Sequence, residues 1–323
     1  MSHSISRRTV LSLAALASGI PGAFAQNWPS KPIKIIAPFP PGGFTDVVTR
    51  RVANMLATDL GQPVIVENRP GAGTNIGNEA AANSPADGYT LLMGTSSLAI
   101  NRTLYAKLSY DADRDLLPLG TFATTGYTLL ANPSLPVSNV AQLIALAKSK
   151  PDGLTFASSG NGAVNHLAGA LFMSMADVKM QHIPYKGSQA ALGDLIGGQV
   201  QLFWASNLEA MPMIKAGRVK ALGVTTREPV SVLPGVPPIG ETVKGYEAVY
   251  WMGLYAPAKL PTAMAERLTA ALRAIAASAE MRESLLASGA ESAFGGPAAA
   301  RALLARDTQT WGKLVRETGA RVD

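Results

Sequence analysis

The stretch Pro38–Asp46, which reads P-F-P-P-G-G-F-T-D, contains the residue types most suited to binding an anion. The apolar run Ile33–Ala37 precedes it, and helically spaced apolar residues follow over Val47–Leu56. Its two glycines allow a tight turn with bare backbone, and Thr45 or Asp46 can cap the new helix. A helix start offers free N–H groups and partial positive charge, which suit a carboxylate or phosphate. We predict that this loop forms half of an anion-binding cleft; the alternative is a turn that binds nothing.

A second unit of the same kind occurs further along the chain. The strand-like run Leu154–Ala157 leads into Ser158–Gly162, and a helical pattern carrying Asn165 and His166 follows. Two such units, one in each domain, could direct two helix starts at one anion. For His166 two interpretations remain: a neutral, hydrogen-bonded structural histidine, or a ligand contact.

Small hydroxyl side chains also follow the strand-like run Tyr89–Met93, at Thr95 and Ser96. Ligands of open α/β sheets bind at the carboxyl ends of strands, so these hydroxyls are candidate ligand contacts. The alternative is that they only cap the helix that begins near Leu98.

The residues needed for common catalytic sites are missing. The chain has no cysteine and three histidines, of which His3 lies in the N-terminal segment. His166 and His182 do not have a metal-binding spacing, and no G-x-S-x-G motif is present. The glycines in Gly71–Gly73 match a dinucleotide loop poorly. We therefore expect no cofactor, no metal and no enzymatic activity; a Ser–His–Asp site assembled from distant residues is the alternative.

Length and composition indicate a folded, soluble protein of two domains. The chain has 323 residues, 47% hydrophobic and 15% charged, with a net charge of +6. Loss of Arg7 and Arg8 with a signal peptide leaves 26 basic against 22 acidic residues, or +4. No Lys/Arg cluster of the type that binds nucleic acid is present, so we expect no nucleic-acid partner.

The first 25 residues have the three parts of a signal peptide. Ser6–Leu11 contains an arginine pair, a short apolar run continues to Leu16, and Ala23–Ala25 has the A-x-A form. We predict cleavage before Gln26 and a periplasmic location. The arginine pair is typical of twin-arginine export but also fits the general secretory route, and an uncleaved membrane anchor is the alternative.

Repeated strand–helix units fall into two blocks, which predicts an α/β fold with mainly parallel sheets. The segment Leu117–Leu130 reads as two extended pieces broken at Gly126. We place the crossings between domains near Phe122 and Ala248. Helices over Thr262–Ala277 and Pro297–Thr318 then return to the first domain. The predicted domains are 26–122 plus 248–323, and 123–247.

Several of these motifs together resemble one family. The blocks W-P-S-K-P-I-K-I-I-A-P-F-P-P-G-G-F-T-D, V-I-V-E-N-R-P-G-A-G-T-N-I-G and F-A-S-S-G-N-G-A-V-N-H-L-A are similar to those of the Bug proteins. Bug proteins are periplasmic solute receptors of tripartite tricarboxylate transporters. The likeness continues in order through the whole mature chain, to W-G-K-L-V near its end.

The resemblance implies a two-domain periplasmic binding protein of the Venus flytrap form, type II-like, with two linking segments. Such a receptor, expected to be a monomer, binds a small carboxylate in its cleft and delivers it to transporter subunits in the inner membrane. A periplasmic sensor would use the same cleft and is an alternative. Asp46 is expected to organise its loop, because like charges repel. The ligand-facing residues implied by matching motifs are Gly43, Phe44, Thr45, Asp46, Thr95, Ser96, Ser158, Asn161, Asn165 and His166.

The chain departs from the family pattern at Ala205 and Ser206, where related proteins often place an acidic or amide pair. Loss of an acid would remove a partner for a ligand amine. Trp204, Phe44 and Trp251 could supply flat apolar walls. We therefore predict a carboxylate without an ammonium group, with an aromatic or aliphatic body; the alternative is that Trp204 packs in the core.

Overall fold

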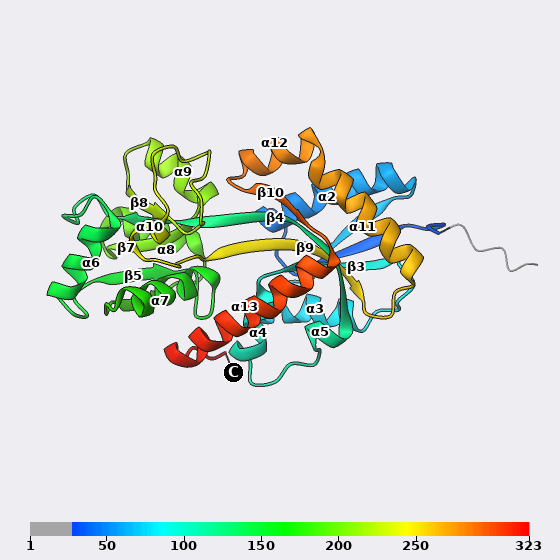
Figure 1. Ribbon diagram of the computed structural model, residues 1–323, viewed down its shortest axis with the longest axis horizontal. Helices are drawn as coiled ribbons and strands as arrows, with labels where there is room; N and C mark the ends of the chain where they lie inside the picture. Colours follow the sequence, from blue (N-terminus) through cyan, green and yellow to red (C-terminus); the bar gives the residue numbers. More distant parts are fainter. Residues whose placement is uncertain (1–27, 323) are drawn as a thin grey trace, which may run out of the picture.

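The apolar run Ile33–Ala37 forms strand β1 in the computed structural model, which describes residues 28–322 (Figure 1). Strands β2 (Val64–Asn68) and β3 (Thr90–Thr95) lie beside β1 in parallel, as the strand–helix pattern predicts. Helix α2 (Phe44–Leu60) follows β1 after the glycine turn, and its apolar side packs against the sheet. The predicted signal peptide and its cleavage point lie outside the described residues.

Helices cover both faces of the sheet in this first lobe. Consecutive residues of β1, Ile35 and Ile36, are both buried because each face has its own hydrophobic core. Helices α2 and α11 (Thr262–Ala277) pack on one face, and α3 (Asn75–Ala82) and α4 (Ser97–Leu104) pack on the other. The remaining elements of this lobe include η1 (Ala72–Thr74), α5 (Ala112–Asp115), α12 (Ala279–Ala287) and β10 (Glu291–Gly295).

The second lobe repeats this arrangement around a smaller sheet. Strand β5 (Thr155–Ser158) pairs in parallel with both β6 (Gln181–Pro184) and β7 (Leu202–Ser206). Strand β8 (Lys220–Val224) runs antiparallel to β4 (Leu116–Ala131), a long strand that enters from the first lobe. The helices of this lobe are α6 (Val140–Ser149), α7 (Val164–Ala176), α8 (Ser188–Gly197), α9 (Asn207–Lys215) and α10 (Ile239–Thr242).

Two long strands join the lobes (Figure 1). Strand β4 (Leu116–Ala131) pairs with β9 (Val249–Pro257) as far as Gly126, and from Tyr127 it pairs with β7. The predicted break at Gly126 is wrong, because this glycine keeps Val249 as its ladder partner and the strand continues. The expectation of mainly parallel sheets is also wrong. Strand β9 runs antiparallel to both its neighbours, so the sheet is mixed.

The two long C-terminal helices are confirmed with the predicted bounds. Helix α11 belongs to the first lobe, and α13 (Pro297–Thr318) crosses the linking strands. The C-terminal end of α13 reaches helix α7 of the second lobe (Figure 1). The chain therefore connects its lobes by two strands and by a helix that packs on both.

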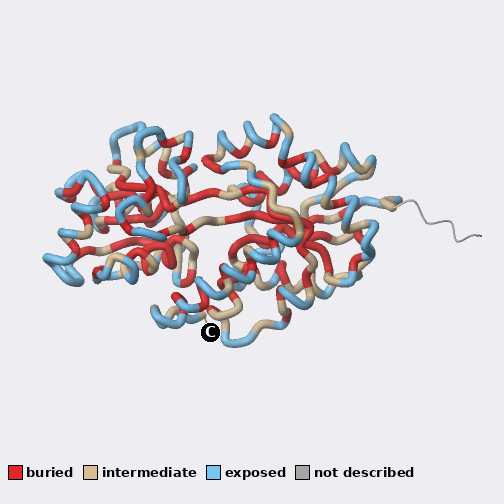
Figure 2. Tube along the Cα trace, in the orientation of Figure 1, coloured by how far each residue is buried: buried red, intermediate tan, exposed pale blue. Residues whose placement is uncertain are grey.

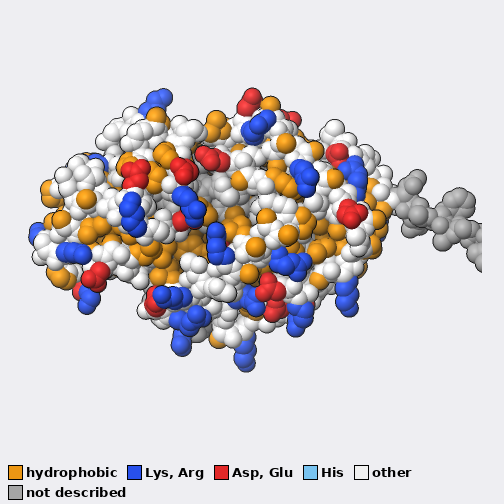
Figure 3. All heavy atoms as spheres, in the orientation of Figure 1, with side chains coloured by type: hydrophobic (Ala, Val, Ile, Leu, Met, Phe, Trp, Pro, Cys, Tyr) orange, Lys and Arg blue, Asp and Glu red, His pale blue; other side chains and the backbone are white. Residues whose placement is uncertain are grey.

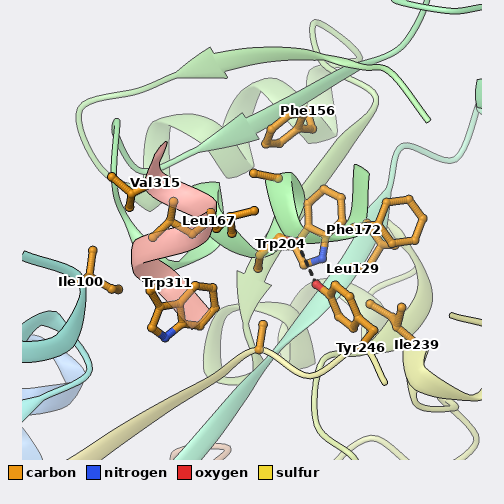
Figure 4. Packing of buried hydrophobic residues seen from close by; sticks show 14 of the residues in the cluster. Ile100, Leu129, Phe156, Leu167, Phe172, Trp204, Ile239, Tyr246, Trp311 and Val315 are labelled. Atoms are coloured by element: carbon orange, nitrogen blue, oxygen red, sulfur yellow. Dashed lines mark hydrogen bonds between the residues drawn. The ribbon is translucent and has the colours of Figure 1, made fainter. Parts of the chain in front are cut away.

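Burial follows the strands through the interior of each lobe (Figure 2). In the second lobe Trp204 is fully buried and lies against Phe156 and Phe172, with its indole nitrogen toward the Tyr246 hydroxyl (Figure 4). That hydroxyl donates to the carbonyl oxygen of Ala168 at 3.0 Å. Trp204 therefore belongs to the hydrophobic core of this lobe.

Candidate functional site

A cavity of about 450 Å³ lies between the lobes, at the carboxyl ends of β1, β3 and β5. Ligands of open α/β sheets bind at this edge. Loops of the first lobe form one wall, the loop after β5 forms the opposite wall, and the linking strands contribute two tyrosines. The lining residues are Pro38, Phe39, Pro40, Pro70, Gly71, Gly73, Thr74, Thr95, Ser97, Ile100, Asn101, Leu104, Tyr105, Tyr127, Ser159, Gly160, Asn161, Gly162, Ala163, Val164, Tyr250 and Val322.

Lysine, arginine, aspartate and glutamate are all missing from this lining. Two helices begin on the cavity wall instead, α4 at Ser97 and α7 at Val164. The preceding residues, Ser96 and Ala163, make no side-chain capping bond to either helix start. The first N–H groups of a helix carry partial positive charge. These two helix starts can therefore hold an anion without a cationic side chain.

Connected hydroxyl groups lie along the first-lobe wall. Thr74 Oγ1 donates to Ser97 Oγ at 2.8 Å, and Ser97 Oγ lies 2.9 Å from Thr95 Oγ1. Asn78 Nδ2 donates to Thr74 Oγ1 at 3.1 Å and fixes the inner end of this chain. Because a hydroxyl can donate as well as accept, the chain can turn a hydrogen toward a carboxylate. Thr95 was predicted here from sequence; Thr74 and Ser97 were missed, although Ser97 lies in the same small-residue run.

Tyr250 brings a phenol from strand β9 to the cavity. Its hydroxyl oxygen lies 2.9 Å from Thr45 Oγ1. Burial raises the pKa of Tyr250 to about 12, against the opposite effect of hydrogen bonds with Thr45 and Thr95, so the phenol is neutral. Thr45 itself is buried outside the lining, where it orients Tyr250. No local sequence signal marks Tyr250, because its place depends on the crossing of β9 between the lobes.

Asp46 is the centre of the hydrogen-bond network that shapes the first loop. Its carboxylate accepts from Gly42 N at 2.9 Å, from Arg50 Nε and Nη2 at 3.0 Å each, and from Asn68 Nδ2 at 2.7 Å. Asn68 Nδ2 also donates to the carbonyl oxygen of Phe39, a cavity residue, at 3.0 Å. Burial would raise the pKa of Asp46, but the bonds from Arg50, Gly42 and Asn68 lower it overall. The carboxylate thus stays charged and ties the loop to β2.

Gly42 allows the turn that this network closes. Its φ of +85° lies in the left-handed region, which side chains of L-residues rarely adopt. The turn brings the Gly42 N–H back to the helix residue Asp46 and leaves Gly43 exposed. Phe44 packs against the first-lobe core.

The second-lobe loop is held from behind by buried side chains. Gly160 N donates to Ser158 Oγ at 3.1 Å, and Ser159 N donates to Asn165 Oδ1 at 3.2 Å. Gly162 N donates to His166 Nδ1 at 3.1 Å. Ser158, Asn165 and His166 are buried, and none of the three lines the cavity.

The structure therefore divides the predicted site residues into three groups. Thr95 and Asn161 line the cavity. A second group lies directly behind the lining or at the ends of its loops, and comprises Gly43, Phe44, Thr45, Asp46, Ser96, Ser158, Asn165 and His166. The last group is fully buried in the hydrophobic cores and away from the cavity wall: Trp204, Ala205 and Trp251.

Trp204 and Trp251 were expected as apolar walls, but packing turns both inward. Trp251 Nε1 donates to Asp307 Oδ2 at 2.8 Å, and Asp307 is 5% exposed. The apolar part of the cavity wall comes instead from Phe39, Ile100 and Leu104, together with neighbouring prolines.

Comparison with known proteins identifies the family. The model of the tripartite tricarboxylate transporter family receptor matches residues 48–320. The chain belongs to this family. A UPF0065 protein from the tcbD-tcbE intergenic region of a Pseudomonas species is 36% identical over 318 residues, covering 97% of this chain and 95% of that protein. BugT of Bordetella pertussis is 36% identical over 307 residues, covering 92% of each.

Solved structures confirm the predicted two-domain α/β fold of periplasmic binding proteins. Rpa4515 of R. palustris with adipate has a TM-score of 0.79 at 33% identity, covering 90% of this chain and 98% of that one. The periplasmic binding protein BugD has a TM-score of 0.75 at 31% identity, covering 91% and 99%. MatC of Rhodopseudomonas palustris with bound malate has a TM-score of 0.73 at 28% identity, covering 89% and 100%.

Metal-holding clusters and membrane-spanning helices are not found in the part of the chain that the structure describes. Within residues 28–322 no group of three His, Cys, Asp or Glu side chains is placed to hold a metal ion. None of the described helices combines the length and apolar character needed to cross a membrane. On the face shown in Figure 3, basic and acidic side chains are interspersed.

Proposed function

We propose that this receptor binds a small organic carboxylate in the cavity between its lobes and delivers it to the inner-membrane subunits of a tripartite transporter. The observation that carries the proposal is a cavity walled by both lobes, with two helix starts on its wall and no charged side chain in its lining. Bound adipate and malate in two similar receptors support the same ligand class.

The preferred ligand is a carboxylate without an ammonium group. An ammonium group that leaves water is best compensated by an acidic partner, and no Asp or Glu lines the cavity. The apolar wall of Phe39, Ile100 and Leu104 suits an aliphatic or aromatic body. Charge-assisted hydrogen bonds contribute about 1.5–3 kcal/mol each, so a few support micromolar binding after the costs of association.

Closure of the lobes follows from ligand contacts on both walls. A ligand that touches both lobes has contacts in the closed state that the open state lacks, so binding shifts the population toward closure. We propose that β4 and β9 act as the linking segments, and that the domains are 26–122 plus 248–323, and 123–247. The ladder exchange between Gly126 and Tyr127 supports a crossing in this part of β4.

We further propose that the receptor is a monomer, exported to the periplasm after cleavage before Gln26, and that it is not an enzyme. Ser158 Oγ lies 2.6 Å from His182 Nε2, which is the spacing of a nucleophile and its base. Ser158 is fully buried, and no hydrogen bond between His182 and a carboxylate is found among the described residues. The pair therefore supports the loop rather than a reaction. Loss of ester turnover in Ser158→Ala would revive the hydrolase alternative.

Isothermal titration calorimetry of the mature protein tests the ligand class. We expect micromolar binding within a panel of adipate, benzoate, hexanoate and malate, and none of glutamate or aspartate. Tight binding of the amino acids alone would contradict the proposal. Uptake and signalling measured with and without the partner permease separate the transport receptor from the periplasmic sensor.

A further inference from the structure

His166 stands behind the second-lobe loop rather than in the ligand cavity. The residue is 7% exposed, and its Nδ1 accepts the N–H of Gly162 at 3.1 Å. Gly162 itself lines the ligand cavity. The imidazole borders a separate cavity of about 690 Å³ between α7 and the end of α13. A ligand in the first cavity therefore meets Gly162 and not the imidazole.

The imidazole is held in a fixed orientation. Its ring stacks on that of His182, with centroids 3.9 Å apart and an interplanar angle of 11°. Phe156 also packs on His182, with ring centroids 4.9 Å apart and an interplanar angle of 27°. Because Nδ1 accepts a hydrogen bond, the neutral ring must carry its proton on Nε2. The tautomer and the position of Gly162 thus depend on each other.

The loop that His166 supports has little freedom across the cleft. Gly162 has a φ of +74°, and a Cβ at this position would lie 2.4 Å from Leu104 Cδ2 of the first lobe. The backbone at Gly162 therefore passes so close to Leu104 that no side chain fits between the two lobes at this point.

We propose that His166 is a positioning residue for ligand binding: its Nδ1 holds the Gly162 N–H and so sets the distance between the second-lobe loop and the ligand. The inference rests on the proposed function of this cavity. Positioning of the loop requires Nδ1, which accepts the Gly162 N–H, whereas a direct contact with the ligand would use Nε2. The two roles therefore depend on different nitrogens of one ring.

A matched pair of variants separates these roles. In His166→Asn the amide oxygen can occupy the place of Nδ1, and in His166→Gln the amide nitrogen can occupy the place of Nε2. Both variants lose the same ring stacking, so their difference reports which nitrogen matters. With adipate and benzoate as probes in calorimetry, we expect His166→Asn to bind within about threefold of wild type. His166→Gln should bind about tenfold more weakly, which is the factor that corresponds to 1.4 kcal/mol.

The reverse order, with His166→Gln near wild type and His166→Asn weak, would overturn the proposal, as would equal affinities for all three proteins. A second measurement needs neither ligand nor variant. Nitrogen-15 NMR of the wild-type mature protein at pH 7 should show His166 with Nδ1 unprotonated and Nε2 protonated, and the opposite tautomer would refute the inference. Wild type that binds no carboxylate, yet has the expected tautomer, would refute the ligand proposal and leave the positioning geometry intact.

Discussion

Replacing Asp46 by asparagine tests the network that shapes the first loop. The substitution preserves side-chain size but removes the charge that four hydrogen bonds share. The Asp46 side chain is 4% exposed, whereas that of Arg50 is 48% exposed. Asparagine keeps one acceptor oxygen and turns an N–H₂ group toward donors that formerly met a carboxylate oxygen.

The expected loss of stability in Asp46→Asn depends on which hydrogen-bond donors can return to water. A lost charge-assisted bond costs about 1.5–3 kcal/mol when its groups are buried. The half-exposed Arg50 regains water, so its share falls to about 0.5 kcal/mol. The bond from Asn68 is partly buried and retains most of its value. We expect Asp46→Asn to lower the free energy of unfolding by about 2 kcal/mol at pH 7.

Urea unfolding of the mature protein measures this difference, with Val47→Ala as the matched control. Val47 is 50% exposed on the same helix turn, so its truncation should change stability by less than about 0.5 kcal/mol. The pKa of Asp46 in the folded protein lies below its ordinary value of 3.8. The stabilisation is therefore complete above that value and is lost as pH falls through the folded pKa.

The difference between wild type and Asp46→Asn should accordingly shrink in acid. A variant as stable as wild type at pH 7 would refute the idea that the carboxylate organises the loop. A difference that stays constant down to pH 2 would refute the assigned role of its charge.

Three further predictions concern other parts of the molecule. Gly162→Ala should weaken adipate or benzoate binding at least tenfold in calorimetry, because its Cβ would meet Leu104 across the cleft. Gly217→Ala is the matched control: Gly217 has a similar φ of +65° but open space at its Cβ and does not line the cavity, so this variant should bind like wild type. Trp251→Phe should cost about 2 kcal/mol in urea unfolding, because it leaves the buried Asp307 carboxylate with Arg306 alone; a cost below 0.5 kcal/mol would contradict this. Burial lowers the pKa of His166 from 6.5 to about 4, so the unfolded chain binds more protons than the folded one in this pH range. The free energy of unfolding should therefore fall by up to about 3 kcal/mol between pH 6.5 and pH 4. His166→Asn should reduce this dependence of the free energy of unfolding on pH.

Local patterns in the sequence were enough to predict several elements and one loop role. The strand–turn–helix unit around Gly42 and the two long C-terminal helices depend on neighbouring residues, and they appear where expected. Asp46 was expected to organise its loop, and its bonds to Gly42 and Arg50 lie within four residues along the chain. The family resemblance, carried by several blocks in order, led to the correct family and fold.

Contacts between distant segments decided the rest. Trp204 could have faced a ligand or the core, and only the packing of Phe156 and Phe172 around it places it inside. Tyr250 reaches the cavity because β9 crosses between lobes, and His166 meets His182 because β6 lies beside β5. Sequence periodicity reports which face of an element is apolar, but burial and register between elements are set by the free energy of the whole packed structure.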